Sequence, residues 1–415
     1  MEKFKKLSKA FFINGGAGRV VCSIPALEKY ASESGDDDFI IVSESWQELY
    51  QASVPLRDRV YALNHKDLFK DHLKNKEVVS PEPYRLNAYF NQKVNLCQAF
   101  DIIINELDHI PEGTDNKVPY LELSKTEQIT GHNIVNEVKE VSGCDKVVVF
   151  QPFGQSVQVE GKFIFDTSGR SFEITNVVEI IQQLKENNYG IIIMSQIEIP
   201  SWQTMGIAMP KNLNLLGWSG VIKAADYFLG CDSVGQHLAV AVQKDATVVL
   251  GSTYPENISY LDVQGHTIVD LGYDKQIDKY KRNYSPIRLT MDESTDRGNE
   301  DCMIVNPGNL NKIIKSITDS VGVGKKVEPK SPSYNQSPPN VPNTYSQTPK
   351  IPKITKSGQS ITKKLLTPPK QVAGFNKPKI AKKKPIDQLV EMELNKDTKV
   401  DPSVLLEKPV KKSDS

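Results

Sequence analysis

Two short segments of the chain combine residue types that suit the binding of an anionic ligand. The first, Phe11–Val20, is an apolar run followed by Gly15, Gly16, Gly18 and Arg19. Glycines let the backbone approach a ligand closely, and the free N–H groups at a helix start attract an anion. The segment matches neither the GxGxxG nor the GK[ST] phosphate-loop pattern, so it indicates no NAD or ATP site. A tight strand-to-helix turn without a ligand would explain the same residues.

The second segment, Gly230–Ala239, lies between an expected helix and an expected strand, and it contains Asp232, Ser233, Gly235, Gln236 and His237. Either Asp232 or Ser233 could cap the helix that follows, so that its first amides face a ligand. A phosphate placed there would meet N–H donors, a hydroxyl and the His237 imidazole. The alternative is that His237 is a structural histidine at the start of this helix.

Other residues with suitable chemistry leave two interpretations open. Trp202 and Trp218 could stack on a nucleotide base or could pack in the core. A polar cluster could supply a proton-accepting base or form a solvated strand end; its members are Asp101, Glu106, Asp108 and His109. No HExxH or other metal-ligand spacing occurs, so we expect no metal site.

Strand-like and helix-like patterns alternate along most of the chain. The expected strands are 10–14, 39–42, 60–63, 102–104, 120–123, 147–150, 191–194, 213–216 and 247–250. The expected helices are 20–30, 46–52, 134–141, 177–184, 221–228, the segment after Asp232, and 310–317. Such alternation predicts an α/β fold whose parallel sheets are covered on both faces. We expect two Rossmann-like domains, 1–145 and 146–324, that face a ligand-binding cleft.

Charge and proline are concentrated at the C-terminal end. Residues 325–415 hold 19 lysines, no arginine, 8 acidic residues and 13 of the 25 prolines, a net charge of +11, whereas residues 1–324 carry −11. This composition cannot bury enough apolar surface to offset the entropy of ordering. We therefore expect 325–415 to be a disordered basic tail, with one short helix over 386–395. The tail could contact an acidic partner or a membrane surface, or be a solvated linker, and nothing in it indicates specific nucleic-acid binding.

Several classes of protein are excluded. No run approaches the ~18 consecutive apolar residues of a membrane-spanning helix, and the N-terminus does not have the apolar region of a signal peptide. The five cysteines are dispersed without a CxxC pair, which argues against a disulfide framework or a zinc knot and indicates a reducing compartment. We expect a cytoplasmic protein that could reach a membrane surface through its tail.

At this point a family resemblance becomes visible. Asp232-Ser233, a histidine five residues after Asp232, and the later Val248–Thr253 run resemble the donor-binding segment of ADP-heptose:lipopolysaccharide heptosyltransferases, glycosyltransferase family 9. Gly15–Leu27 is similar to the glycine-rich opening of that family. Val148–Gly154 resembles the start of its second domain, and Cys302–Pro307 resembles its closing segment. The resemblance covers roughly residues 10–320. Ser156 and Arg170–Phe172 are looser matches to a hydroxyl-bearing loop and a basic-aromatic pair, and the resemblance thereby implies that Ser156 also binds the donor phosphate.

The resemblance implies the two-domain GT-B architecture and transfer of a sugar from a nucleotide-diphosphate sugar to a glycan or another hydroxyl compound. It implies neither a cofactor nor a catalytic metal. In this family an acidic residue, thought to be the catalytic base, usually follows the opening glycine, but this chain has Arg19 there. Arginine cannot accept a proton at neutral pH, although it can hold a phosphate or carboxylate. The sequence therefore leaves two functions open: a glycosyltransferase, or a GT-B-fold binding or scaffold protein without turnover.

Overall fold

The computed structural model describes residues 7–112, 117–160, 163–166, 168–197, 199, 202, 206–274, 279–280 and 302–327. The tail from residue 328 onward and its expected helix over 386–395 lie outside the described residues. Among the described helices, none is both long enough and apolar enough to cross a membrane.

The described chain alternates strands and helices in two successive halves. The first half contains β1 (Ser8–Ile13), α1 (Ala17–Glu33), β2 (Ile40–Ser43), η1 (Gln47–Ala52), η2 (Arg57–Arg59), β3 (Val60–Ala62), η3 (Leu68–His72), β4 (Lys76–Val79), η4 (Pro83–Arg85), α2 (Asn87–Phe90), α3 (Leu96–Ile104) and α4 (Lys125–Ser142). The second half contains β5 (Lys146–Gln151), β6 (Val157–Glu160), β7 (Phe163–Asp166), α5 (Ile174–Glu186), β8 (Tyr189–Ile193), α7 (Leu215–Ala224), β9 (Tyr227–Cys231), α8 (Val234–Ala241), β10 (Ala246–Leu250), α9 (Pro255–Ile258), β11 (His266–Asp270), β12 (Tyr273–Asp274), β13 (Lys279–Tyr280) and α11 (Pro307–Val321).

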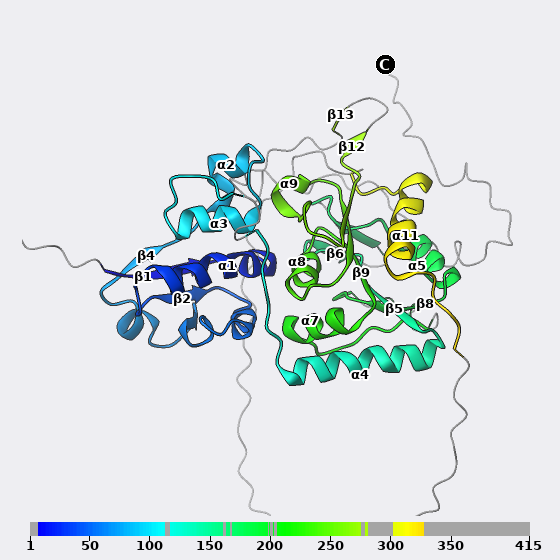
Figure 1. Cartoon of the computed structure of the whole chain (residues 1–415), viewed down its shortest axis with the longest axis horizontal. Helices are drawn as coiled ribbons and strands as arrows, with labels where there is room; N and C mark the ends of the chain where they lie inside the picture. Colours follow the sequence, from blue (N-terminus) through cyan, green and yellow to red (C-terminus); the bar gives the residue numbers. More distant parts are fainter. Residues whose placement is uncertain are drawn as a thin grey trace, which may run out of the picture. The chain divides into compact units, whose positions relative to one another are not determined.

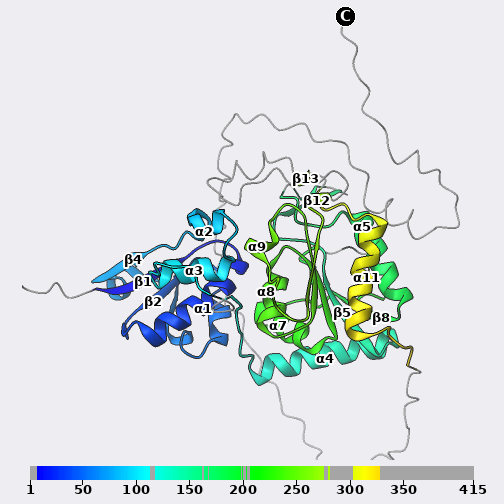
Figure 2. The ribbon, with the colours of Figure 1, turned by 45° about the horizontal axis from the view of Figure 1, so that its top comes forward.

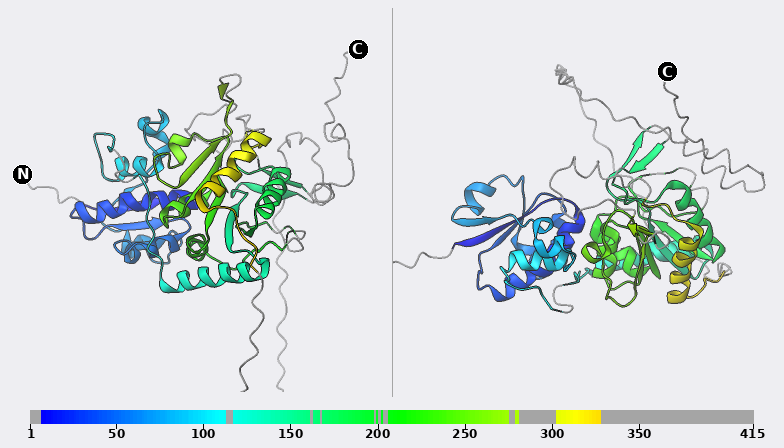
Figure 3. Two further views of the ribbon diagram at one scale, coloured as in Figure 1. Left: turned by 45° about the vertical axis from the view of Figure 1, so that its right-hand side comes forward. Right: turned by 90° about the horizontal axis from the view of Figure 1, so that it is seen from above.

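Each half is built on its own parallel sheet (Figure 3). The strand order is β3-β2-β1-β4 in the first sheet and β11-β10-β9-β5-β8 in the second. Every pairing in both sheets is parallel, and the described antiparallel pairs are the short β6–β7 and β12–β13 ribbons. The structure thus confirms the α/β prediction with two parallel sheets; the exact division at residue 145 stays a prediction.

Helices cover both faces of the second sheet (Figure 2). Val148 and Phe150 of β5 share a buried apolar cluster with residues of α5 and α11. Val147 and Val149, which alternate with them, belong to the cluster that contains α7 and α8 residues. Because successive side chains of a strand point to opposite faces, a continuous apolar run is what a doubly covered strand requires.

Helix α4 is the last element of the first half in sequence, but it packs along α7 of the second half (Figure 1). A Cβ atom at Gly131 would lie 2.1 Å from the Gly220 carbonyl oxygen, and one at Gly220 would lie 2.2 Å from the Glu127 carbonyl oxygen. Glycine on both helices therefore permits this contact. Helix α4 begins with a capping box in which Ser124 and Glu127 bond each other's backbone amides.

Several expected elements differ from the structure. Residues 102–104 end helix α3, which a capping box of Asn95 and Gln98 starts. Residues 120–123 form no strand, and residues 213–216 lead into α7, whose first turn is capped by Asn214. The expected helix over 221–228 stops at Ala224, since strand β9 begins at Tyr227. In the expected helix over 46–52, Gln47–Ala52 forms a 3₁₀ helix and Trp46 is its N-cap residue. In each case tertiary packing or a polar cap overrode a short apolar run, which does not by itself distinguish strand from helix.

The start of the expected tail makes ordered contacts. The Lys325 carbonyl accepts from the Asp145 amide at 3.1 Å, and the Val327 amide donates to the Gly143 carbonyl at 2.8 Å. The backbone therefore continues along the end of α4 for three residues beyond the position at which the sequence indicated a tail.

Candidate functional site

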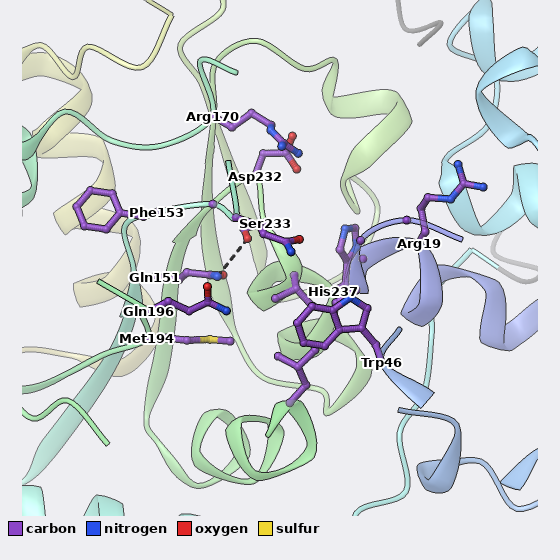
Figure 4. Close-up of a pocket in the computed structure, with 18 of the residues that line it drawn as sticks. Arg19, Trp46, Gln151, Phe153, Arg170, Met194, Gln196, Asp232, Ser233 and His237 are labelled. Carbon is purple, nitrogen blue, oxygen red and sulfur yellow. Dashed lines mark hydrogen bonds between the residues drawn. The ribbon is translucent and has the colours of Figure 1, made fainter. Parts of the chain in front are cut away.

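A cavity of ≈ 670 Å³ is lined by residues from both halves. The first half contributes residues 14–19, Glu44, Trp46, Glu82, Tyr84 and Leu96. The second half contributes Gln151, Phe153, Gly154, Gln155, Val157, Arg170, residues 194–197, residues 213–215, Trp218, residues 232–234, His237 and Ile258. Both segments singled out from the sequence thus line one cavity, and Figure 4 shows Arg19 and Trp46 (blue ribbon) across from Ser233 and Gln151 (green ribbon).

The start of α8 is organised by the side chain of Gln151, which ends the buried strand β5. Its Nε2 donates to Ser233 Oγ at 3.1 Å, and its Oε1 accepts from the Gly235 amide at 2.9 Å. Ser233 occupies the N-cap position but makes no capping bond with its own side chain. Of the first helix amides, that of Gly235 is therefore used within the protein. The Val234 amide, at the first helical position, has no acceptor inside the helix.

Asp232 lies at the rim of the cavity with a buried carboxylate. Its Oδ1 accepts from Gln236 Nε2 at 3.1 Å, while Gln236 Oε1 accepts from Ser259 Oγ at 3.0 Å. Its Oδ2 is buried without a hydrogen-bond partner. Gln236 and Gly235 do not line the cavity. Both were predicted to be donor-site residues, but they lie outside the cavity, where Gln236 bonds Asp232 and the Gly235 amide bonds Gln151.

His237 connects the two halves. Its Nδ1 shares a hydrogen bond with the Tyr260 hydroxyl at 2.7 Å and contacts Cys22 Sγ of α1 at 3.5 Å. A Cβ atom at Gly18 would lie 2.9 Å from His237 Cδ2 and 3.1 Å from its Nε2, so the imidazole edge faces the glycine loop. Gly18 is therefore required by close packing against His237.

Electrostatics favour the charged form of His237. Burial lowers the pKa of His237, but the charge of Cys22 and the contact with its sulfur raise that pKa above its usual value overall. Burial would raise the pKa of Cys22, yet hydrogen bonding with Cys97 and the charge of His237 bring it well below its usual range. The two shifts share a cause, since an imidazolium and a thiolate 3.5 Å apart stabilise each other, and such a pair carries no net charge.

Arg170 brings a cationic side chain to this wall of the cavity. Its Nε donates to Ser168 Oγ at 3.1 Å and its Nη2 to Ser156 Oγ at 3.3 Å. Two of the five N–H donors of Arg170 are used in these bonds. Ser156 does not line the cavity, so its contact with Arg170 positions that side chain.

Asp166 organises the turn that carries Arg170. Its Oδ1 accepts from the amide and the hydroxyl of Ser168, and its Oδ2 accepts from the Ser171 hydroxyl at 2.5 Å. Burial alone would raise the pKa of Asp166, but the hydrogen bonds from Ser168 and Ser171 lower it. An ionised Asp166 therefore fixes the loop between β7 and α5.

Arg19 lies on the first turn of α1, where its guanidinium is engaged within the first half. Its Nη2 donates to the Pro81 carbonyl at 3.0 Å, and its Nη1 lies 3.7 Å from Glu82 Oε2. The guanidinium also lies over the rings of Tyr84 and Phe100, at 5.0 and 5.7 Å from their centroids. In Figure 4 it points away from Asp232 and Ser233.

Of the two tryptophans and the polar cluster that the sequence analysis left open, only one tryptophan lines the cavity. Trp218 lines the cavity, whereas Trp202 is fully buried and stacks on Phe153 with 6.3 Å between ring centroids. The polar cluster of the first half does not line the cavity. Asp101 is buried against Lys29, Glu106 pairs with Lys9, and Asp108 pairs with His109 at the surface.

The cavity residues that the sequence analysis missed include Gln151, Glu44 and Glu82. Gln151 ends β5, Glu44 directly follows β2, and Glu82 lies three residues after β4. Ligands in parallel α/β sheets bind beyond the carboxyl ends of strands, so polar residues directly after each strand were a usable signal. Strand β4 was not predicted, so the sequence did not indicate that Glu82 follows a strand. Among the described residues, no cluster of three or more His, Cys, Asp or Glu side chains could hold a metal ion.

Comparison with known proteins identifies the architecture. No protein-family model matches the chain, and no curated protein matches its sequence. A glycosyl transferase family 9 structure from Veillonella parvula DSM 2008 is similar in fold, with a TM-score of 0.52, 8% identity, and coverage of 76% of this chain and 98% of that chain. The chain thus has a GT-B fold similar to that of this structure.

Two further structures are related at lower scores. The iron-containing dodecameric glycosyltransferase TibC from enterotoxigenic E. coli H10407 has a TM-score of 0.49 and 14% identity, covering 77% of this chain and 81% of that chain. E. coli ADP-heptose lps heptosyltransferase II has a TM-score of 0.48 and 10% identity, covering 74% of this chain and 98% of that chain. In the GT-B fold of the present chain, the cavity is lined by loops that follow strands of both sheets.

Proposed function

We propose that this chain is a glycosyltransferase that uses a nucleotide-diphosphate sugar as donor. The observation that carries the proposal is the cavity in a GT-B fold, which the start of α8, Arg170 and His237 line together with the glycine loop. No cofactor or metal is required for this chemistry, since the leaving group is already a good one once its charge is stabilised.

The diphosphate would lie against the second half of the cavity. The Val234 amide supplies an N–H donor at the positive end of the helix dipole, and Ser233 supplies a hydroxyl. Arg170 offers guanidinium donors at the same wall, and the His237 imidazole also lines it. These groups would also stabilise the negative charge that develops as the nucleotide diphosphate leaves.

The sugar and base have separate surfaces in the same cavity. The buried Oδ2 of Asp232 is without a partner, so a donor hydroxyl would satisfy it. Trp218 presents an aromatic side chain at the wall, suited to stacking on a nucleobase. The acceptor would be a glycan or another hydroxyl compound held by the first half.

A second function is favoured by one observation, which is that Arg19 replaces the acidic residue that follows the opening glycine in this family. A binding or scaffold protein would retain the donor site but transfer nothing. Calorimetry with ADP, UDP and GDP, together with release of nucleotide diphosphate from a panel of nucleotide sugars, separates the two. We expect binding and turnover; binding without turnover of any donor would support the scaffold, and the absence of both would contradict the donor site.

A further inference from the structure

Two carboxylates of the first half line the cavity, and the function proposed above does not yet use them. They belong to Glu44 and Glu82. Sugar transfer to a hydroxyl requires a group that accepts the hydroxyl proton, and this group must face the cavity. Arg19 cannot serve, because a guanidinium stays protonated in proteins.

The topology of the first sheet favours Glu82. The strand order β3-β2-β1-β4 reverses direction between β1 and β4. In parallel α/β sheets, the crevice beyond the carboxyl ends of strands at such a reversal is the usual ligand position. The loop after β1 is the glycine loop, and the loop after β4 carries Pro81 and Glu82. Glu82 therefore lies in the loop that completes this crevice.

Arg19 holds that loop in place through three kinds of contact: the bond to the Pro81 carbonyl at 3.0 Å, the approach of 3.7 Å to Glu82, and the stacking on Tyr84. The Arg19 side chain is 10% exposed, while that of Glu82 is 39% exposed. The Arg19 guanidinium is thus held in place and largely shielded from solvent, whereas the Glu82 carboxylate reaches the cavity and solvent. A general base needs this access, because it must release the proton after each turnover.

Glu44, the other carboxylate of the first half, contacts the backbone of the glycine loop. Its Oε2 accepts from the Gly15 amide at 3.1 Å, and its side chain is exposed. Gly15 has a φ of +85°, a conformation that favours glycine. Glu44 therefore stabilises the turn of the glycine loop.

We propose that Glu82 is the general base of the transfer and that Arg19 is its positioning residue; this rests on the glycosyltransferase function proposed above. The acceptor O–H proton passes to the Glu82 carboxylate while the acceptor oxygen forms a bond to the anomeric carbon. The bond from that carbon to the phosphate oxygen breaks, and the nucleotide diphosphate leaves with the electron pair. Glu82 then returns the proton to water. The acidic function absent from position 19 is thus supplied by the loop after β4.

The test compares Glu82→Gln with Glu77→Gln, a matched change on exposed β4 outside the cavity. Release of nucleotide diphosphate from a panel of nucleotide sugars reports turnover, and calorimetry with ADP, UDP and GDP reports donor-site binding. A positioned general base contributes about 10²- to 10⁴-fold. We expect Glu82→Gln to lower kcat at least about 100-fold with the nucleotide Kd within about twofold, and Glu77→Gln to match the wild type.

Variants of Arg19 test positioning. We expect Arg19→Ala to lower kcat about 10-fold or more, and Arg19→Lys to restore part of that loss because the point charge remains without the guanidinium fork. Wild-type turnover in Glu82→Gln, or loss of turnover in Glu44→Gln alone, would overturn the base assignment and leave the glycosyltransferase function standing. A wild type that binds nucleotide but turns over no donor would contradict both.

Discussion

The two walls of the cavity differ in charge and in how their polar groups are held. The second-half wall offers the start of α8, Arg170 and the His237 imidazole, while the first-half wall offers the carboxylates of Glu44 and Glu82. The cation of the first half, Arg19, is turned to Glu82 and the Pro81 carbonyl. Under the proposed function, this difference assigns diphosphate binding to the second-half wall and proton acceptance to the first-half wall.

The largest expected effect concerns the contact that joins α4 to the second half. Gly131→Ala would place a methyl group 2.1 Å from the Gly220 carbonyl oxygen, so the helices must separate. We expect the free energy of unfolding to fall by about 3 kcal/mol in denaturant titrations. Gly308→Ala is the matched control, because its Cβ would meet only Asn306 Oδ1 at 3.4 Å. Equal stability of the two variants would contradict the close helix packing.

The second prediction tests the charge of the second-half wall. Arg170→Gln should weaken ADP or UDP binding about 10- to 150-fold, since a hydrogen bond to a charged group contributes about 1.5–3 kcal/mol. Arg57→Gln, an exposed arginine outside the cavity, should bind like the wild type. If Arg19→Gln weakens ADP or UDP binding in calorimetry as much as Arg170→Gln does, the proposed difference between the two walls is wrong.

The third prediction concerns pH. Burial, aided by the charge of His237, lowers the pKa of His266 to about 4. Because the folded value lies below the usual ~6.5, the neutral form stabilises the fold, and this stability is complete above about pH 6.5 and lost as pH falls toward 4. We expect a loss of about 2 kcal/mol over that range. His266→Gln should flatten the dependence in unfolding titrations, and His132→Gln, exposed on α4, should not; similar curves for both would refute the assignment.

The smallest effect concerns His237 itself. His237→Gln removes the imidazolium at the start of α8, and we expect the Kd for ADP or UDP to rise about 10-fold. Tyr260→Phe removes the hydroxyl that bonds Nδ1 and should produce a smaller rise. Unchanged nucleotide affinity in both, with wild-type stability, would make His237 a packing residue against Gly18.

The second half was largely predictable from sequence, and the first half was less so. Strands β5, β8 and β10 are continuous apolar runs buried on both faces, a pattern with few alternatives. In the first half, β4 reads Lys-Glu-Val-Val and is partly exposed, so neither an apolar run nor an alternation marks it. The apolar residues 102–104 looked like a strand because the capping residues Asn95 and Gln98 lie further upstream.

The same contrast applies to the site. Glycine spacing and the Asp232–His237 segment were visible, because backbone freedom and helix capping leave local signatures. Gln151 and Glu82 were not visible, since their roles depend on contacts with residues more than 60 positions away, Gly235 and Arg19. Long-range partners of this kind are determined by the order of strands in the sheet.

A crystal structure of the chain with ADP or UDP bound tests most directly which wall of the cavity binds the diphosphate. The account predicts the diphosphate at the start of α8, within hydrogen-bond distance of the Val234 amide and the Arg170 guanidinium, with the Glu82 carboxylate on the opposite wall. A diphosphate seated instead on Gly15–Gly18 beside Arg19 would contradict it.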